Sequence, residues 1–168
     1  PPMTQGELDM SFDLPYTRLP HPKYKGKRIP AFDMIKFSVN LHRGCFGGCA
    51  FCTISAHQGK FIVSRSKESI LREVKAITEM PDFKGYIHDV GGPTANFRYP
   101  SCDKQLKDGV CPSRKCLAPT PCKNLKIDHS EYMHMVGEIE KIPRVKKVFI
   151  RSGIRFDYAL ADKDDTFI

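Results

Sequence analysis

The stretch that decides the fold is residues 34–52, MIKFSVNLHRGCFGGCAFC. Apolar and polar residues alternate from Ile35 to Asn40, which is the two-residue period of a half-buried β-strand. Three cysteines follow at once, in a loop that also contains three glycines. Because glycine lets the backbone turn tightly without steric penalty, the stretch predicts a strand that ends in a compact cysteine loop.

The spacing of Cys45, Cys49 and Cys52 indicates a metal centre with three protein thiolates. Thiolates are soft ligands that suit iron–sulfur clusters and zinc. A [4Fe–4S] cluster with three protein ligands keeps one iron open, whereas electron-transfer clusters usually have every iron ligated by protein. The alternative is a zinc site completed by His42, His57 or a distant cysteine. Structural zinc sites usually use four ligands in paired spacings, so the spacing favours the cluster.

Helical and strand periods alternate after this loop. The expected elements are a helix from the N-cap Ser66 to Pro81, a strand over 85–90, a helix from the capping pair Asp128 and Glu131 to Pro143, and a strand over 148–150. This order predicts an α/β fold of parallel βαβ units. Since about three parallel strands leave edges without neighbours, we expect the first half of a larger, partial (β/α) barrel.

The chain divides into two expected parts. Residues 1–33 are rich in proline and basic side chains, which predicts an extended lead-in with little structure of its own. Residues 34–168 form the α/β part, interrupted at about 97–127 by a cysteine-rich insertion without a clear period. Because a bare loop of that length is uncommon in a compact domain, we expect a bound metal to hold it together.

That insertion contains a second group of cysteines: Cys102, Cys111, Cys116 and Cys122. Four thiolates could bind zinc or a second iron–sulfur cluster, and nearby lysines and arginines could offset their charge. The spacings lack the two-residue pairs of familiar zinc knuckles, so both metals and a metal-free insertion remain open.

Composition narrows the functional classes. The 168 residues are 40% hydrophobic and 27% charged, as in globular proteins. No run of about 18 apolar residues predicts a membrane span, and no secretory leader is evident. Seven cysteines, an odd number, argue against a closed disulfide framework, so the cytoplasm is the expected compartment. The net charge of +8 leaves an RNA partner open, although the positive charge is scattered.

Several stretches resemble the YgiQ-type radical S-adenosylmethionine (SAM) proteins. They are the segment from Pro15 to Cys52 and residues 64–70, 91–96 and 151–157. The resemblance implies that the first three cysteines bind a [4Fe–4S] cluster whose fourth iron binds SAM. It also implies that the reduced cluster cleaves SAM to a 5′-deoxyadenosyl radical, which abstracts hydrogen from a substrate. The family has no settled substrate and its members are much longer, so the resemblance implies a chemistry and not a pathway.

The same resemblance implies a set of SAM contacts: Phe51, Gly91, Gly92, Pro93, Thr94, Arg65, Ser152 and Arg155. Phe51 is expected to pack near the adenine. The glycine pair stands where the family places a Gly-Gly-Glu motif that meets the SAM amino group, and Pro93 replaces the glutamate. A guanidinium of Arg65 or Arg155 could pair with the SAM carboxylate; the alternative for these polar residues is an ordinary surface role.

Two functions of different classes result. The first is the cluster- and SAM-binding part of a radical SAM enzyme with an unknown substrate and an electron donor such as flavodoxin or ferredoxin. The alternative is a non-catalytic module, stabilised by zinc or an iron–sulfur cluster, that binds RNA or protein.

Overall fold

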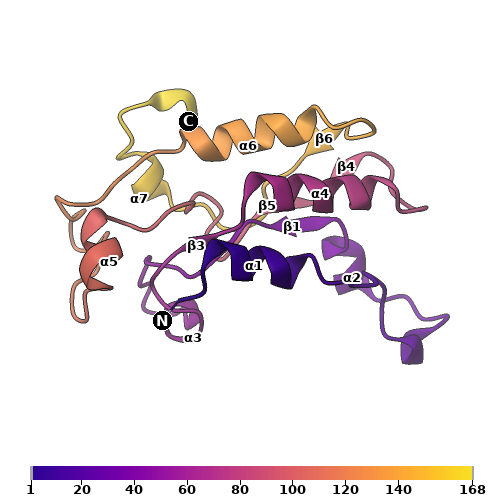
Figure 1. Cartoon of the computed structure of the whole chain (residues 1–168), viewed down its shortest axis with the longest axis horizontal. Coiled ribbons are helices and arrows are strands. Elements are labelled where there is room, and N and C mark those ends of the chain that lie inside the picture. Colours follow the sequence, from indigo (N-terminus) through magenta and orange to yellow (C-terminus); the bar gives the residue numbers. More distant parts are fainter. Residues whose placement is uncertain (1, 168) are drawn as a thin grey trace.

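The computed structural model describes residues 2–167 and shows a mixed α/β arrangement (Figure 1). Pro1 and Ile168, the ends of the two expected parts, lie outside the described residues. The helices are α1 (Gln5–Phe12), α2 (Pro30–Ile35), α3 (Ile54–His57), α4 (Lys67–Thr78), α5 (Asp103–Asp108), α6 (Ser130–Glu140) and α7 (Phe156–Ala159), with 3-10 turns η1 (Pro22–Tyr24) and η2 (Asp165–Phe167). The strands are β1 (Ser38–Asn40), β2 (His42–Arg43), β3 (Val63–Ser64), β4 (Tyr86–Ile87), β5 (Asp89–Gly91) and β6 (Lys147–Val148).

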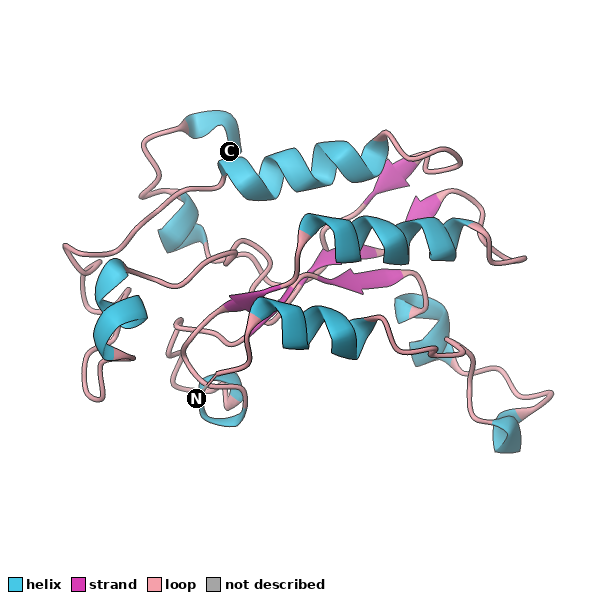
Figure 2. Cartoon of the chain, in the orientation of Figure 1, coloured by secondary structure: helices cyan, strands magenta, loops and turns pink. Residues whose placement is uncertain are grey.

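The parallel strands occur in two short pairs, β1 with β5 and β4 with β6. Only His88 separates β4 from β5, and the Val90 amide donates to the Phe149 carbonyl beyond β6 at 3.1 Å. These hydrogen bonds link the two pairs into one layer (Figure 2). Within this layer the paired strands are parallel. Strands β2 and β3 form a separate antiparallel pair.

Helices α4 and α6 contact each other and the parallel strands, and they supply most of the main core. The buried residues of α4 include Ile70, Val74 and Ile77, at the helical spacing that the sequence predicts. Tyr132 of α6 is also fully buried, and its hydroxyl donates to the Val90 carbonyl at 2.8 Å. Each such side chain stabilises the fold by about 1.5–3 kcal/mol, so the helices fix the strands beneath them.

A smaller core joins the first cysteine loop to the cysteine-rich insertion. Phe46 stacks on Phe97 with ring centroids 3.8 Å apart, and Tyr158 meets both rings edge-on. Leu117 of the insertion is buried in the same cluster as Cys45. The insertion therefore packs directly against the loop that carries the first cysteines.

The structure differs from the expected extended lead-in, because residues 5–12 form helix α1. Thr4 and Glu7 cap its first turn reciprocally, a capping box that sequence reasoning missed. The helix docks because Leu8 is buried and a carboxylate oxygen of Asp9 accepts from the Ser66 amide at 2.9 Å. Ser66 itself caps α4 as predicted, through its hydroxyl and the Ser69 amide.

The predicted capping pair Asp128 and Glu131 is wrong. The N-cap of α6 is His129, and the Asp128 side chain accepts from the amide of Ser130, two residues further on. The buried His129 is held by Asp162 through both its ring and its amide, and this long-range contact sets where the helix begins.

The described residues form no closed barrel. The three expected strands correspond to β1, to β4 with β5, and to β6, and the antiparallel pair of β2 and β3 was not expected. The insertion contains one six-residue helix, α5. None of the helices in residues 2–167 has the length and apolar character needed to cross a membrane.

Candidate functional site

Three loops meet where the parallel strands end. The cysteine loop comes after β1 and the short strand β2, the segment Gly91 to Thr94 lies at the end of β5, and the segment Arg151 to Arg155 follows β6. A β-carbon on Gly91 would lie 2.7 Å from the Ser152 hydroxyl oxygen, and the Ala95 amide donates to the Gly153 carbonyl at 2.9 Å. Because the carboxyl ends of parallel strands share one edge, loops distant in sequence are brought together here.

The cysteine loop has a backbone that requires glycine. Gly44 has a φ of +90°, and a β-carbon there would lie 2.0 Å from the Phe61 carbonyl oxygen. Gly47 lies between the first two cysteines, since a β-carbon on it would be 3.3 Å from the Cys45 sulfur and 3.8 Å from the Cys49 sulfur. The Cys52 amide donates to the Cys49 carbonyl at 3.2 Å, which closes a turn over residues 49–52. The glycines therefore fold the loop so that the sulfurs of Cys45 and Cys49 both lie beside Gly47.

Each of these two sulfurs contacts a polar group from another loop. The Thr94 hydroxyl lies 3.4 Å from the buried Cys45 sulfur. The Arg155 guanidinium donates to the Cys49 sulfur at 2.9 Å and to the Gly47 carbonyl at 3.4 Å. Hydrogen bonds that the guanidinium donates to the Asp157 carboxylate raise the pKa of Arg155 above its ordinary value, so the group beside this sulfur is a cation.

Arg155 is positioned by a chain of buried polar groups. Its amide donates to the Asn96 side-chain oxygen at 2.9 Å, and the Asn96 amide group lies 3.0 Å from the His129 ring nitrogen. The other ring nitrogen of His129 pairs with Asp162. Burial, the largest single influence, raises the pKa of Asp162. The hydrogen bonds from the His129 ring and from the backbone amides of Asp164 and His129 together outweigh it, so the pKa lies below the ordinary value. Sequence reasoning assigned no role to His129, because the signal lies in contacts 33 residues apart.

His42 is a second residue whose position the sequence did not reveal. It is 0% exposed, and neither ring nitrogen has a hydrogen-bond partner. A β-carbon on Gly92 would lie 2.5 Å from the ring, so the second glycine of the pair makes room for the imidazole. Burial, reinforced by the charges of Arg98 and Arg43, lowers the pKa of His42 to about 3. The ring is therefore neutral at pH 7.

Two other residues that were predicted to contact SAM, Phe51 and Arg65, lie in opposite surroundings, one exposed and one buried. Phe51 is 92% exposed and packs on no core cluster. Arg65 is fully buried, where it pairs with Glu73, donates to the Asn40 carbonyl at 3.0 Å and lies over the Phe12 ring. These contacts give Arg65 a role in tying α1, β1 and α4 together.

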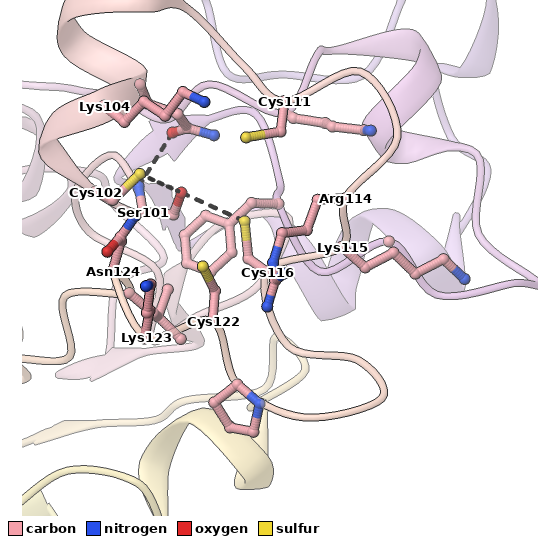
Figure 3. A pocket seen from close by; sticks show the side chains of 16 residues that line it. Ser101, Cys102, Lys104, Cys111, Arg114, Lys115, Cys116, Cys122, Lys123 and Asn124 are labelled. Carbon is pink, nitrogen blue, oxygen red and sulfur yellow. Dashed lines mark hydrogen bonds between the residues drawn. The ribbon is translucent and has the colours of Figure 1, made fainter.

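The second group of cysteines lines one pocket beside the first loop (Figure 3). Among residues 2–167, no three cysteine, histidine, aspartate or glutamate side chains lie close enough together to bind one metal ion as they stand. All seven cysteines are free thiols. Their soft donors and their location nevertheless fit a thiolate-bound centre, since two sulfurs of the first loop flank Gly47 and the pocket gathers four more.

The site is thus a cysteine loop near the carboxyl ends of the parallel strands of a mixed α/β structure. The Radical SAM N-terminal family model matches residues 1–38. The chain is 60% identical over 165 residues to a UPF0313 protein of Bacteroides thetaiotaomicron, covering 98% of this chain and 27% of the relative. It is 55% identical over 168 residues to one of Clostridium botulinum and 53% identical over 167 residues to one of Clostridium perfringens, covering 99% of this chain and 26% and 25% of those relatives.

Over residues 1–38 the chain is thus similar to the radical SAM N-terminal family, and over nearly its full length it is similar to part of the UPF0313 proteins, which is consistent with a fragment of a radical SAM protein of the YgiQ type. It spans about a quarter of the length of the curated relatives it matches. No solved structure matches it.

Proposed function

We propose that this chain is the cluster- and SAM-binding part of a radical SAM enzyme, with Cys45, Cys49 and Cys52 as the cluster ligands. The observation that carries the proposal is the meeting of three strand-end loops at two cysteine sulfurs, one beside Thr94 and one beside Arg155. In partial (β/α) barrels, chemistry takes place at this edge. A [4Fe–4S] cluster held by these thiolates and reduced by an external electron donor would supply the electron that cleaves SAM to methionine and a 5′-deoxyadenosyl radical.

The residues of the chain orient and neutralise the site. The Arg155 cation offsets thiolate charge at Cys49, and the Thr94 hydroxyl does so at Cys45 through a hydrogen bond. Gly91 and Gly92 lack side chains because Ser152 and the His42 ring occupy the space where their β-carbons would lie. Phe51 is free to cover a bound adenine because it is exposed.

The whole protein's substrate and partners are part of this proposal. A hydrogen donor substrate and an electron donor such as flavodoxin or ferredoxin are required by the chemistry, and the seven free cysteines support a reducing compartment such as the cytoplasm. Further strands of a (β/α) barrel would complete the substrate pocket beside β1 and β6.

The test is an EPR spectrum of the anaerobically reconstituted and reduced full chain, with and without SAM. We expect a [4Fe–4S]⁺ signal that SAM perturbs and that the Cys45/Cys49/Cys52→Ala variant lacks. The matched control, Cys102/Cys111/Cys122→Ala, also removes three thiols and should keep the SAM-sensitive signal.

The proposal would be overturned if the first-loop variant had the same EPR spectrum as the wild type and SAM perturbed neither spectrum. A colourless protein without iron would favour the non-catalytic module. In that case, RNA binding that weakens steeply with salt would identify a phosphate-contacting surface.

A further inference from the structure

The cysteine-rich insertion has little regular structure with which to fold. Its one helix, α5, has six residues, and only Gln105 of that helix is buried. A few backbone bonds close the rest, among them those from the Cys122 amide to the Cys116 carbonyl at 2.8 Å and from the Lys126 amide to the Ser101 carbonyl at 2.8 Å. Few buried apolar groups and few hydrogen bonds provide little free energy against the entropy of ordering about 30 residues. A further source of stability is needed.

These backbone bonds place four thiols around one pocket of about 450 Å³. Figure 3 shows the sulfurs of Cys102, Cys111, Cys116 and Cys122 directed toward this shared space. The Ser101 hydroxyl lies between two of them, since it donates to the Cys102 sulfur at 4.0 Å and accepts from the Cys116 thiol at 3.5 Å. The four cysteines, spread over 21 residues of sequence, therefore face one another.

The charge of the pocket suits an anionic occupant. Five of its lining residues are basic: Lys60, Lys104, Arg114, Lys115 and Lys123. No aspartate or glutamate is among the residues that line it. A centre with four thiolates carries a net negative charge, and neighbouring cations favour the thiolate over the thiol. The positive charge of the lysines and arginine that line the pocket is thus complementary to the negative charge of a centre with four thiolates.

The pocket also has a wall in common with the first cysteine loop. Phe46 and Gly48 of that loop line it, and a β-carbon on Gly48 would lie 3.7 Å from the Lys115 side chain. An occupant of the pocket would therefore fix the insertion against the loop.

We propose that Cys102, Cys111, Cys116 and Cys122 bind a metal centre of four thiolates, which holds the insertion against the first cysteine loop. The sulfurs move inward across the pocket to reach it, because as they stand no three potential ligands in the described part of the chain lie close enough for one ion. Tetrathiolate ligation suits zinc and iron–sulfur clusters alike. The site is separate from Cys45, Cys49 and Cys52 and does not depend on the proposed function.

The test measures metal bound per chain in the untagged full chain, purified without oxygen from medium containing zinc and iron. The background variant Cys45/Cys49/Cys52→Ala removes the first site, so any remaining metal reports the second. We expect either about one zinc ion, or iron with sulfide and a brown colour, per chain. We expect this metal to disappear when Cys102, Cys111, Cys116 and Cys122 are also changed to serine. A background variant that carries neither zinc nor iron would overturn the proposal.

A second measurement applies if the serine variant does not fold. A mercurial thiol reagent is used to strip the metal from the background variant, and trypsin is then added. Cleavage at Arg114 and Lys115 should become at least tenfold faster after stripping, and returning the metal should restore protection. Equal cleavage rates before and after stripping would contradict a centre that holds the insertion in place.

Discussion

Burial of a neutral His42 should make the fold sensitive to mild acid. The ordinary pKa of histidine is about 6.5, and in this fold the pKa of His42 is lowered to about 3, first by burial and then by Arg98 and Arg43. The unfolded chain therefore takes up a proton below pH 6.5, while the folded chain does not until about pH 3. Stability that is fully present above pH 6.5 is lost as the pH falls toward 3.

The magnitude follows from this difference in proton uptake. Each pH unit below the unfolded pKa costs about 1.36 kcal/mol, so lowering the pH from 7 to 5 should remove about 2 kcal/mol through this one ring. A domain has only about 5–15 kcal/mol of stability in total, so the loss is easily measured.

Urea unfolding at pH 7 and pH 5 tests this expectation, with His42→Leu as the variant. The variant lacks the buried ring and should lose about 2 kcal/mol less than the wild type over that interval. The matched control, His57→Gln, removes an exposed histidine of α3 and should behave as the wild type. The same carboxylates titrate in all three proteins, so their effect cancels when the losses in free energy of unfolding are compared between proteins. If wild type and His42→Leu lose the same free energy, the imidazole is not buried in its neutral form.

Three other perturbations follow from the site. Gly44→Ala should lower the Tm by roughly 6 °C or more, because a β-carbon at φ +90° would lie 2.0 Å from a backbone oxygen; an unchanged melting curve would refute this loop geometry. In the metal-free chain, Arg155→Gln should slow alkylation of Cys49 by roughly two- to tenfold, because the guanidinium no longer donates to the sulfur. Arg155→Lys should retain more of the rate, and equal rates in all three proteins would exclude the contact. Asp162→Asn should cost about 1–3 kcal/mol at pH 7, because the carboxylate accepts from the ring and amide of His129. Since the pKa of Asp162 is lowered in the fold, the wild type should lose this advantage as the pH falls through that pKa, and a difference that stays constant in urea unfolding down to pH 2 would contradict the assignment.

The local elements were largely predictable from the sequence. The buried face of α4 and the N-cap Ser66 lie where the pattern places them, because helical period and capping depend on residues a few positions apart. Helix α1 was missed because the prolines and basic side chains of the surrounding residues 1–33 resemble a linker, although Thr4 and Glu7 form a capping box. Its docking depends on contacts such as that of Asp9 with the Ser66 amide, 57 residues away.

The sequence by itself determined where the candidate thiolate site lies in the chain. Its cysteine spacing and the loop glycines are local, and they identify a thiolate site directly after a strand. Only the tertiary structure decided which groups meet those sulfurs. Thr94 reaches Cys45 across 49 residues and Arg155 reaches Cys49 across 106. Such contacts exist because parallel pairing brings the ends of β1, β5 and β6 to one edge, and no local period in the sequence encodes that pairing.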